Sequence, residues 1–157
     1  MGIILSATAA ADPDEEPPGV HSRSFGFLVL RFMIKRIQIP DILQPVSHYC
    51  HVVESSNIIW ISGLVGMNYD HSIPENTKDQ FDIAMRDFDA CLKAAGGDFS
   101  SVTKVRVFLT NINDRKIINP KRIEYFGEHK PASTLLEVSA LVDPRMKVEI
   151  EAEAIKL

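Results

Sequence analysis

The sequence is poor in cysteine and in long apolar runs. Of its 157 residues only two are cysteines, Cys50 and Cys91, and they lie far apart. A small secreted domain that depends on disulfides would hold many more. We therefore expect two free thiols in a reducing compartment, and we predict that the protein is cytoplasmic. No apolar stretch approaches the roughly 20 residues that a membrane helix needs, so no membrane association is expected.

An excess of basic charge is also missing. The chain holds 17 Lys and Arg residues against 21 Asp and Glu residues, which gives a net charge of −4. Binding to nucleic acid requires a basic surface that neutralises phosphates, and the sequence shows no basic stripe. Nucleic acid is therefore not an expected partner.

Motifs for metals and cofactors are absent as well. Of the five histidines only His48 and His51 are close in sequence, and their spacing on an extended segment places them on opposite faces. Gly63-Leu-Val-Gly66 lacks the third glycine and the helix of a dinucleotide-binding loop. It is either a plain bend or a place where backbone amides approach a small ligand. We expect neither a metal nor a cofactor.

Composition divides the chain into two parts. Residues 1–32 include an Ala-rich segment and the run Asp-Pro-Asp-Glu-Glu-Pro-Pro, with little that can fill a core. We expect a disordered or non-native extension there, with Met33 as a candidate natural start. Residues 33–157 are expected to form one domain.

Within that domain, alternating apolar residues predict strands and one periodic stripe predicts a helix. The expected strands are residues 35–39, 49–54, 58–62 and 102–110. Thr77 and Gln80 form a capping-box pattern at the start of the helix, and Gly96-Gly97 ends it. Seven apolar residues share one helical face: Phe81, Ala84, Met85, Phe88, Cys91, Leu92 and Ala95. This stripe predicts a helix that faces the core.

The C-terminal third predicts a second helix and a hairpin. Asn119-Pro120 marks the helix start, with the asparagine as cap and the proline at the first helical position. Ile123 and Phe126 are expected to face inward. Two alternating runs, residues 133–141 and 148–154, then form a terminal hairpin around Asp143-Pro144.

Two helices against one mixed sheet give an α+β architecture with both helices on one face. In the last strand Glu149, Glu151 and Glu153 share a face, a pattern that is more often a solvated surface than an acid–base site. The face without helices is expected to carry Leu135 and Phe108, and nothing in the chain is left to cover it. An apolar face of this kind is usually completed by another subunit, so the sequence predicts an oligomer.

The order and spacing of these elements resemble the Rid/YjgF family of reactive-intermediate deaminases from Met33 to Leu157. The residues that carry the resemblance are Tyr49, Ile61-Ser62-Gly63, 94–97, 102–110, Asn119 with Tyr125-Phe126, Pro131-Ala132 and 148–152. The resemblance implies a chorismate-mutase-like (bacillus) fold assembled as a homotrimer, with ligand clefts between subunits. It also implies hydrolysis of enamines or imines to 2-oxo acids and ammonia without a cofactor.

The resemblance also assigns the site. Tyr49, Gly63 and Asn119 stand at ligand-binding positions, and Glu149 stands at the catalytic position, where it would orient or protonate through water. The family's substrate-binding arginine directly follows Pro-Ala, where this chain has Ser133. A hydroxyl there replaces a charged bidentate fork, so carboxylate binding is expected to weaken by roughly a few kcal/mol unless another cation substitutes. The available cations are Arg145, Lys130 and Arg106.

Two functions are consistent with this pattern. One is an enzyme that hydrolyses imines or related unstable metabolites in inter-subunit clefts. The other is a trimer that binds a small metabolite, such as a 2-oxo acid, or regulates a partner without turnover. An RNA-cleaving activity that is sometimes attached to the family fits poorly with a net charge of −4.

Overall fold

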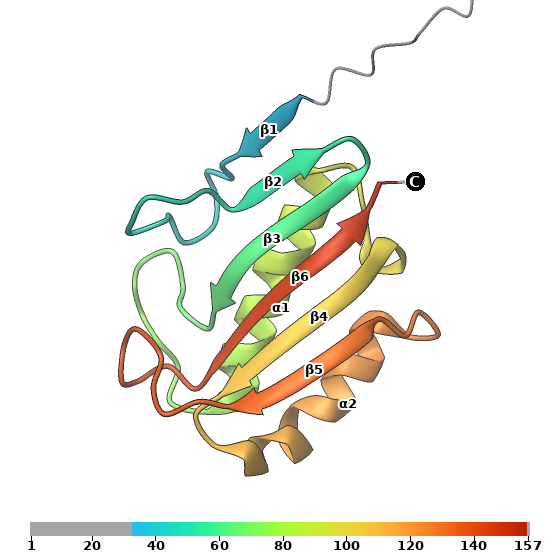
Figure 1. The fold of residues 1–157 in the computed structure, drawn as a ribbon. Helices are drawn as coiled ribbons and strands as arrows, with labels where there is room; N and C mark the ends of the chain where they lie inside the picture. The colour runs from blue at the N-terminus through green and yellow to red at the C-terminus, as the bar shows by residue number, and fades with distance from the viewer. Residues whose placement is uncertain (1–32, 157) are drawn as a thin grey trace, which may run out of the picture. The chain divides into compact units, whose positions relative to one another are not determined.

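The computed structural model describes residues 33–156, so the extension expected over residues 1–32 lies outside the described residues. In the described part a mixed sheet carries two α-helices on one face (Figure 1), which confirms the α+β class. The strands are β1 (Ile34–Ile37), β2 (Val52–Ser55), β3 (Ile58–Val65), β4 (Val102–Leu109), β5 (Ala132–Glu137) and β6 (Val148–Ile155). The helices are α1 (Thr77–Ala94) and α2 (Arg115–Phe126), with short 3-10 turns at η1 (Phe99–Ser101) and η2 (Ile112–Asp114). Neither described helix combines the length and the apolar character that crossing a membrane requires.

The strand order is β1-β2-β3-β6-β4-β5, and this order contradicts the predicted terminal hairpin. Strand β5 pairs in parallel with β4, so that Leu135 lies beside Val107, and it does not pair with β6. Strand β6 instead lies between β3 and β4, where Ile150 is opposite both Leu64 and Val107. A parallel pair cannot be closed by a tight turn, and helix α2 supplies the crossover between β4 and β5.

Helix α1 buries the predicted apolar stripe, because all seven of its residues lie in the hydrophobic core. The predicted capping box is wrong. Asn76 is the N-cap, and its side chain accepts a hydrogen bond from the Asp79 amide at 2.8 Å. Thr77 instead donates to Asp114, at the start of α2. Gln80 is fully buried and binds backbone groups of other segments.

Helix α2 begins about one turn earlier than predicted, because η2 continues directly into it at Arg115. Pro120 therefore lies inside the helix and Asn119 is not its cap. The inward face consists of Ile118 and Phe126, whereas Ile123 is 71% exposed. Successive helical residues are rotated by about 100°, so Ile123, five positions after buried Ile118, lies about 140° away from it around the helix.

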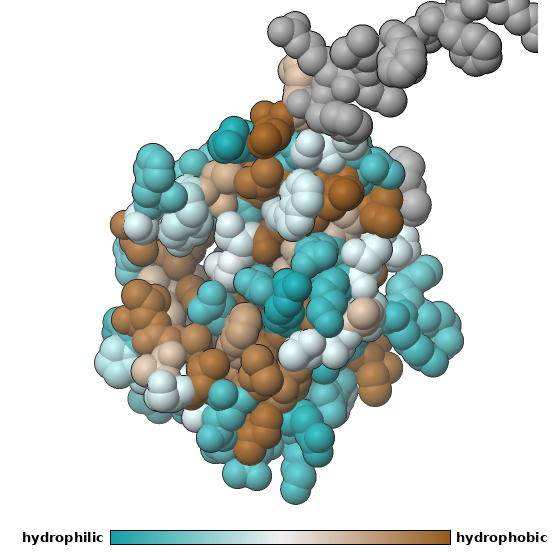
Figure 2. Space-filling model, viewed as in Figure 1, coloured by the Kyte–Doolittle hydropathy of each residue, from teal (hydrophilic) through white to brown (hydrophobic). Residues whose placement is uncertain are grey.

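The sheet face opposite the helices is uncovered in the single chain. Figure 2 shows this face, where hydrophilic and hydrophobic side chains alternate over the surface. Leu135 was expected there, but its register beside Val107 places it on the helix side, against the core. Its neighbour Leu136 is on the open face and is 48% exposed, and Trp60 on β3 is 40% exposed. The inference of an apolar open face therefore holds with Leu136 in place of Leu135.

Candidate functional site

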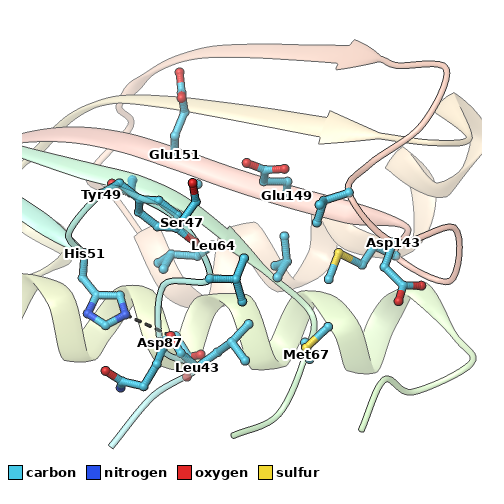
Figure 3. A pocket seen from close by; sticks show the side chains of 17 residues that line it. Leu43, Ser47, Tyr49, His51, Leu64, Met67, Asp87, Asp143, Glu149 and Glu151 are labelled. Atoms are coloured by element: carbon cyan, nitrogen blue, oxygen red, sulfur yellow. Dashed lines mark hydrogen bonds between the residues drawn. The ribbon is translucent and has the colours of Figure 1, made fainter. Parts of the chain in front are cut away.

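A hollow of about 690 Å³, the larger of two described below, lies where β3 and β6 approach the segment 43–51. Figure 3 shows side chains from these segments, from α1 and from the loop before β6 arranged around it. Three of the expected site residues, Tyr49, Gly63 and Glu149, line this hollow. The resemblance thus named three residues, up to 100 positions apart, that line one hollow, and their roles in binding and catalysis stay predictions.

Glu149 and Gly63 are in direct contact within this hollow. Strand β3 has a register shift between Ile61 and Leu64, which places Gly63 next to the Glu149 side chain. A Cβ on Gly63 would overlap the Glu149 carboxylate, so this position needs a glycine for close approach and not for its backbone angles. Burial raises the pKa of Glu149 above its usual value, and the negative charge of Glu151 raises it further.

Tyr49 is held at the mouth of the hollow by the strand beside it. The Ser62 hydroxyl donates to the Cys50 carbonyl at 2.7 Å, and the Ser62 amide donates to the His51 carbonyl at 3.0 Å. These two bonds tie the segment before β2 to the β3 bulge. Tyr49 is 48% exposed, so a ligand in the hollow can reach this residue.

His51 is a structural residue. Its Nδ1 accepts the Ile39 amide at 2.9 Å, so the proton lies on Nε2, which donates to the Leu43 carbonyl at 2.9 Å (Figure 3). Both ring nitrogens are therefore used to hold the loop that lines the hollow. Among residues 33–156 no three His, Cys, Asp or Glu side chains cluster in a way that could hold a metal ion.

Asp87 on α1 is a lining residue that the sequence analysis missed. It is 2% exposed and forms an ion pair with Arg86 at 2.8 Å. Burial raises the pKa of Asp87, and Arg86 opposes that effect. A signal was present in the sequence, because Asp87 lies three residues after Ala84 and one before Phe88, within the apolar stripe of the helix.

The other two expected site residues, Asn119 and Ser133, lie elsewhere. Asn119 lines a second hollow of about 340 Å³ between α2 and the segment that leads to β5. The Ser133 hydroxyl accepts a hydrogen bond of 2.6 Å from Nη2 of Arg122, which lines the same hollow. Arg122 was missed, although it follows Asn119 by three positions and so shares its helical face.

The side chains of Glu149 and Ser133 project from opposite faces of the sheet. Glu149 is in register with Phe108, on the open face, whereas Ser133 is in register with Val105, whose side chain is buried under the helices. Neighbouring strand residues alternate between faces, so the strand geometry keeps the Glu149 and Ser133 side chains apart within one chain.

The three cations that could replace the missing arginine, Arg106, Arg145 and Lys130, lie in different surroundings. Arg106 pairs with Glu151 at 3.0 Å and with Glu153 at 2.9 Å, on the open face. Arg145 pairs with Asp143 at 2.8 Å and lowers the pKa of that carboxyl to about 2. Lys130 lines the second hollow. Two of the three are therefore already neutralised.

Comparison with known proteins places the chain among relatives of known fold. The family model described as Endoribonuclease L-PSP matches residues 40–156. RutC family protein PH0854 of Pyrococcus horikoshii is 34% identical over 115 residues, which cover 72% of this chain and 90% of that protein. The human 2-iminobutanoate/2-iminopropanoate deaminase is 32% identical over 131 residues, which cover 82% of this chain and 92% of the relative.

Solved structures of other proteins have the same fold as this chain. The YjgF gene product of E. coli superposes with a TM-score of 0.73 at 28% identity, over 78% of this chain and 99% of that chain. The E. coli TdcF structure with bound serine gives a TM-score of 0.73 at 27% identity, over 78% and 99% of the two chains. The matched fold is the mixed sheet with two helices described above. This chain therefore belongs to the Rid/YjgF family.

Proposed function

We propose that this protein hydrolyses imines or enamines derived from small amino acids, releasing 2-oxo acids and ammonia. The observation that carries the proposal is the contact between Glu149 and Gly63, which holds a carboxyl of raised pKa inside a hollow of about 690 Å³. The names of the human and mouse relatives, 2-iminobutanoate/2-iminopropanoate deaminase, support this substrate class. No cofactor is needed for such a reaction.

Glu149 would act on water. As a carboxylate it takes a proton from a water molecule whose oxygen forms a bond to the imine carbon. The proton passes to the imine nitrogen, and the resulting carbinolamine loses ammonia as the carbonyl forms. A carboxyl with a raised pKa suits both steps, because it accepts and returns a proton more readily near neutrality. Tyr49, at the mouth, would contact the substrate.

The assembly that we propose is a homotrimer with the site between subunits. The support is geometric, since Glu149 and Ser133 leave opposite faces of one sheet and a ligand that contacts both needs a second copy. The partly apolar open face, with Trp60 and Leu136, provides a surface for that copy. The cytoplasmic location inferred from the cysteines stays a prediction.

A second candidate is a trimer that binds a small metabolite without turnover. One observation favours it: Ser133 stands where the resemblance places an arginine that grips the substrate carboxylate. The structure of the relative TdcF with bound serine supports a small amino-acid-like ligand under either function. The matching family model is described as an endoribonuclease, but this chain has a net charge of −4, which opposes binding to the phosphates of RNA. RNA cleavage is therefore not proposed for it.

A coupled assay separates the two functions. Amino acid oxidase generates 2-iminobutanoate from 2-aminobutanoate, and the formation of 2-oxobutanoate is followed with and without the protein and without added cofactor. The enzyme reading predicts an acceleration that Glu149→Gln removes, whereas Glu75→Gln, an exposed carboxylate before α1, keeps it. No acceleration, together with calorimetric binding of 2-oxobutanoate, would establish the binding trimer instead.

A further inference from the structure

Among the arginines of residues 33–156, Arg122 is partly buried and has no carboxylate partner, whereas Arg36 and Arg115, which also lack an ion pair, are exposed. Three other arginines, Arg86, Arg106 and Arg145, each form an ion pair with a carboxylate at 3.0 Å or less. Within residues 33–156 no carboxylate pairs with Arg122, and its hydrogen bond goes to the neutral Ser133 hydroxyl at 2.6 Å. Its Nε–H is buried and has no acceptor among the described residues.

The surroundings of Arg122 are suited to an anion. The hollow of about 340 Å³ beside it includes Asn119, His129 and Lys130, and none of its lining residues is acidic. Burial lowers the pKa of Arg122, because no negative charge compensates for the lost solvent. An arginine nevertheless stays protonated in proteins, so the hollow is lined by a partly desolvated positive charge that no carboxylate neutralises. The free energy of such a guanidinium falls when an anionic ligand oxygen accepts one of its N–H groups.

We propose that Arg122 binds the carboxylate of the substrate or ligand, in place of the arginine that Ser133 replaces. This inference rests on the proposed function, because it names the group that grips the 2-oxo or 2-imino acid. The positive charge is supplied by helix α2 and not by strand β5, and the two positions are joined directly by the hydrogen bond from Nη2 to Ser133.

Ser133 then has a positioning role. Its oxygen accepts from Arg122, which leaves its own hydroxyl proton free to be donated to a ligand oxygen. The planar fork of Arg122, fixed at one end in this way, presents its remaining N–H groups to a carboxylate. Asn119, one turn earlier on the same helical face, adds an amide beside it. The ligand class is a small carboxylate whose reactive carbon reaches Glu149 of a second copy.

The test compares a charged ligand with its neutral analogue. Calorimetry measures the binding of 2-oxobutanoate and of 2-oxobutanamide to the full-length chain and to Arg122→Gln. We expect the variant to bind 2-oxobutanoate at least about tenfold more weakly, with little change for the amide. Arg115→Gln is the matched control, because this exposed arginine lies on the same helix, and it should bind both compounds as the native chain does.

A second test moves the positive charge from position 122 on α2 to position 133 on β5. The double variant Arg122→Gln/Ser133→Arg places the guanidinium on β5, and we expect it to regain the preference for the carboxylate. Thermal unfolding and gel filtration check that each variant keeps its fold and assembly. Should Arg122→Gln not fold, Arg122→Met, which keeps an unbranched side chain and removes the charge, carries the test. This variant should also lose the preference for 2-oxobutanoate over the amide, and an unchanged preference would overturn the inference.

The failures can be distinguished. If Arg122→Gln binds 2-oxobutanoate as tightly as Arg115→Gln does, the inference is wrong. If the native chain hydrolyses 2-iminobutanoate and Arg122→Gln does so with an unchanged KM, the inference is wrong while the proposed function stands. If the native chain binds 2-oxobutanoate through Arg122 but accelerates no hydrolysis, the inference stands and the enzymatic function is wrong. A native chain that binds no 2-oxobutanoate overturns the inference.

Discussion

The Glu149 carboxylate packs against Gly63 so closely that a Cβ on the glycine would overlap it. The two residues come from adjacent strands, β6 and β3, and the register shift in β3 brings them together. The contact both removes solvent from the carboxylate and fixes its position in the larger hollow. The geometry of the site therefore depends on a residue that has no functional group of its own.

Gly63→Ala should lower activity more than stability. The added methyl meets the flexible Glu149 side chain and not backbone, so the carboxylate can rotate away at a cost of about 1 kcal/mol. Displacing the proposed acid–base group should reduce kcat for imine hydrolysis by at least about tenfold. Steady-state kinetics and thermal unfolding of the same variant measure the two effects.

Gly66→Ala supplies the contrast. A Cβ at Gly66 would overlap the Cα and Cβ of buried Gln80, which cannot rotate away. This variant should therefore lose stability first. Equal effects of the two substitutions on kcat and on unfolding would contradict a specific role for the Gly63–Glu149 contact.

Glu149→Gln should become more stable relative to the native chain as pH rises. The folded pKa of Glu149 lies above the ordinary 4.5, so the folded state binds this proton more tightly than the unfolded state does. The native chain thus loses stability as pH rises from about 4.5 through the folded pKa, and the glutamine variant does not. The gain should stay below about 1.4 kcal/mol for each unit of the shift, because the side chain is partly solvated.

Urea unfolding of both proteins at pH 4 and at pH 7 measures this effect. The difference in unfolding free energy between variant and native chain should be larger at pH 7. A difference that is the same at both pH values would show that the pKa of Glu149 is not raised on folding.

The sequence predicted those elements whose signals are local. The stripe of α1 was correct because helical periodicity depends only on residues within the same helix. The alternation of β6 was also correct, and Val148, Ile150 and Ala152 are buried. The pairing of strands, in contrast, depends on contacts between residues that are far apart in the sequence. Nothing in the alternation of residues 133–137 says that β5 pairs with β4 across a helix, and the short turn at Asp143-Pro144 favoured the wrong partner.

The candidate site was predicted from the resemblance alone, because no local pattern indicates which residues of different strands come together. Tyr49, Gly63 and Glu149 were placed by resemblance, and they line one hollow. Arg122 was missed because a charged residue on a short helix is ordinarily solvated, and only the structure shows that it lacks a carboxylate partner and contacts Ser133. The sequence indicated only that Arg122 follows Asn119 by three positions and so lies on the same face of the helix.

Replacing Gln80 should destabilise the fold although it lies outside the proposed chemistry. Its Nε2 donates to the carbonyls of Pro74 at 2.7 Å and Arg145 at 2.9 Å, and its Oε1 accepts the Lys147 amide at 2.7 Å. Gln80→Leu leaves these backbone groups without partners in a buried position, which should cost about 2–4 kcal/mol.

Chemical denaturation measures that cost, with exposed Lys78→Gln on the same turn of α1 as the control. At a pH where the glutamate is protonated, Gln80→Glu keeps the acceptor for Lys147 and has one O–H donor in place of two N–H donors, so its stability should lie between those of the native chain and the leucine variant. A leucine variant as stable as Lys78→Gln would show that water or rearrangement replaces all three bonds.

Arg145→Gln should change the titration of Asp143 and leave ligand binding unchanged. The guanidinium lowers the pKa of Asp143 to about 2 through side-chain hydrogen bonds, so its removal should return the pKa toward 3.8. Titration followed by NMR at the Asp143 carboxyl carbon detects this. Because Arg145 is already paired, affinity for 2-oxobutanoate should stay within about twofold of the native value. A loss as large as that of Arg122→Gln would mean that Arg145 also contacts the ligand.

Trp60→Glu should disrupt the proposed trimer, and with it the activity. Trp60 lies on the open face of the sheet beside Glu153 and is 40% exposed in the single chain. If another copy covers that face, a buried glutamate next to the existing carboxylate opposes assembly through desolvation and like-charge repulsion. Tyr69→Glu, which changes an exposed aromatic ring in the loop before α1, is the control and should stay trimeric. Light scattering coupled to gel filtration gives the masses, and the imine assay gives the activity of each species. Because the site needs residues from two copies, a monomeric Trp60→Glu protein that hydrolyses 2-iminobutanoate at the native rate would contradict the inter-subunit cleft.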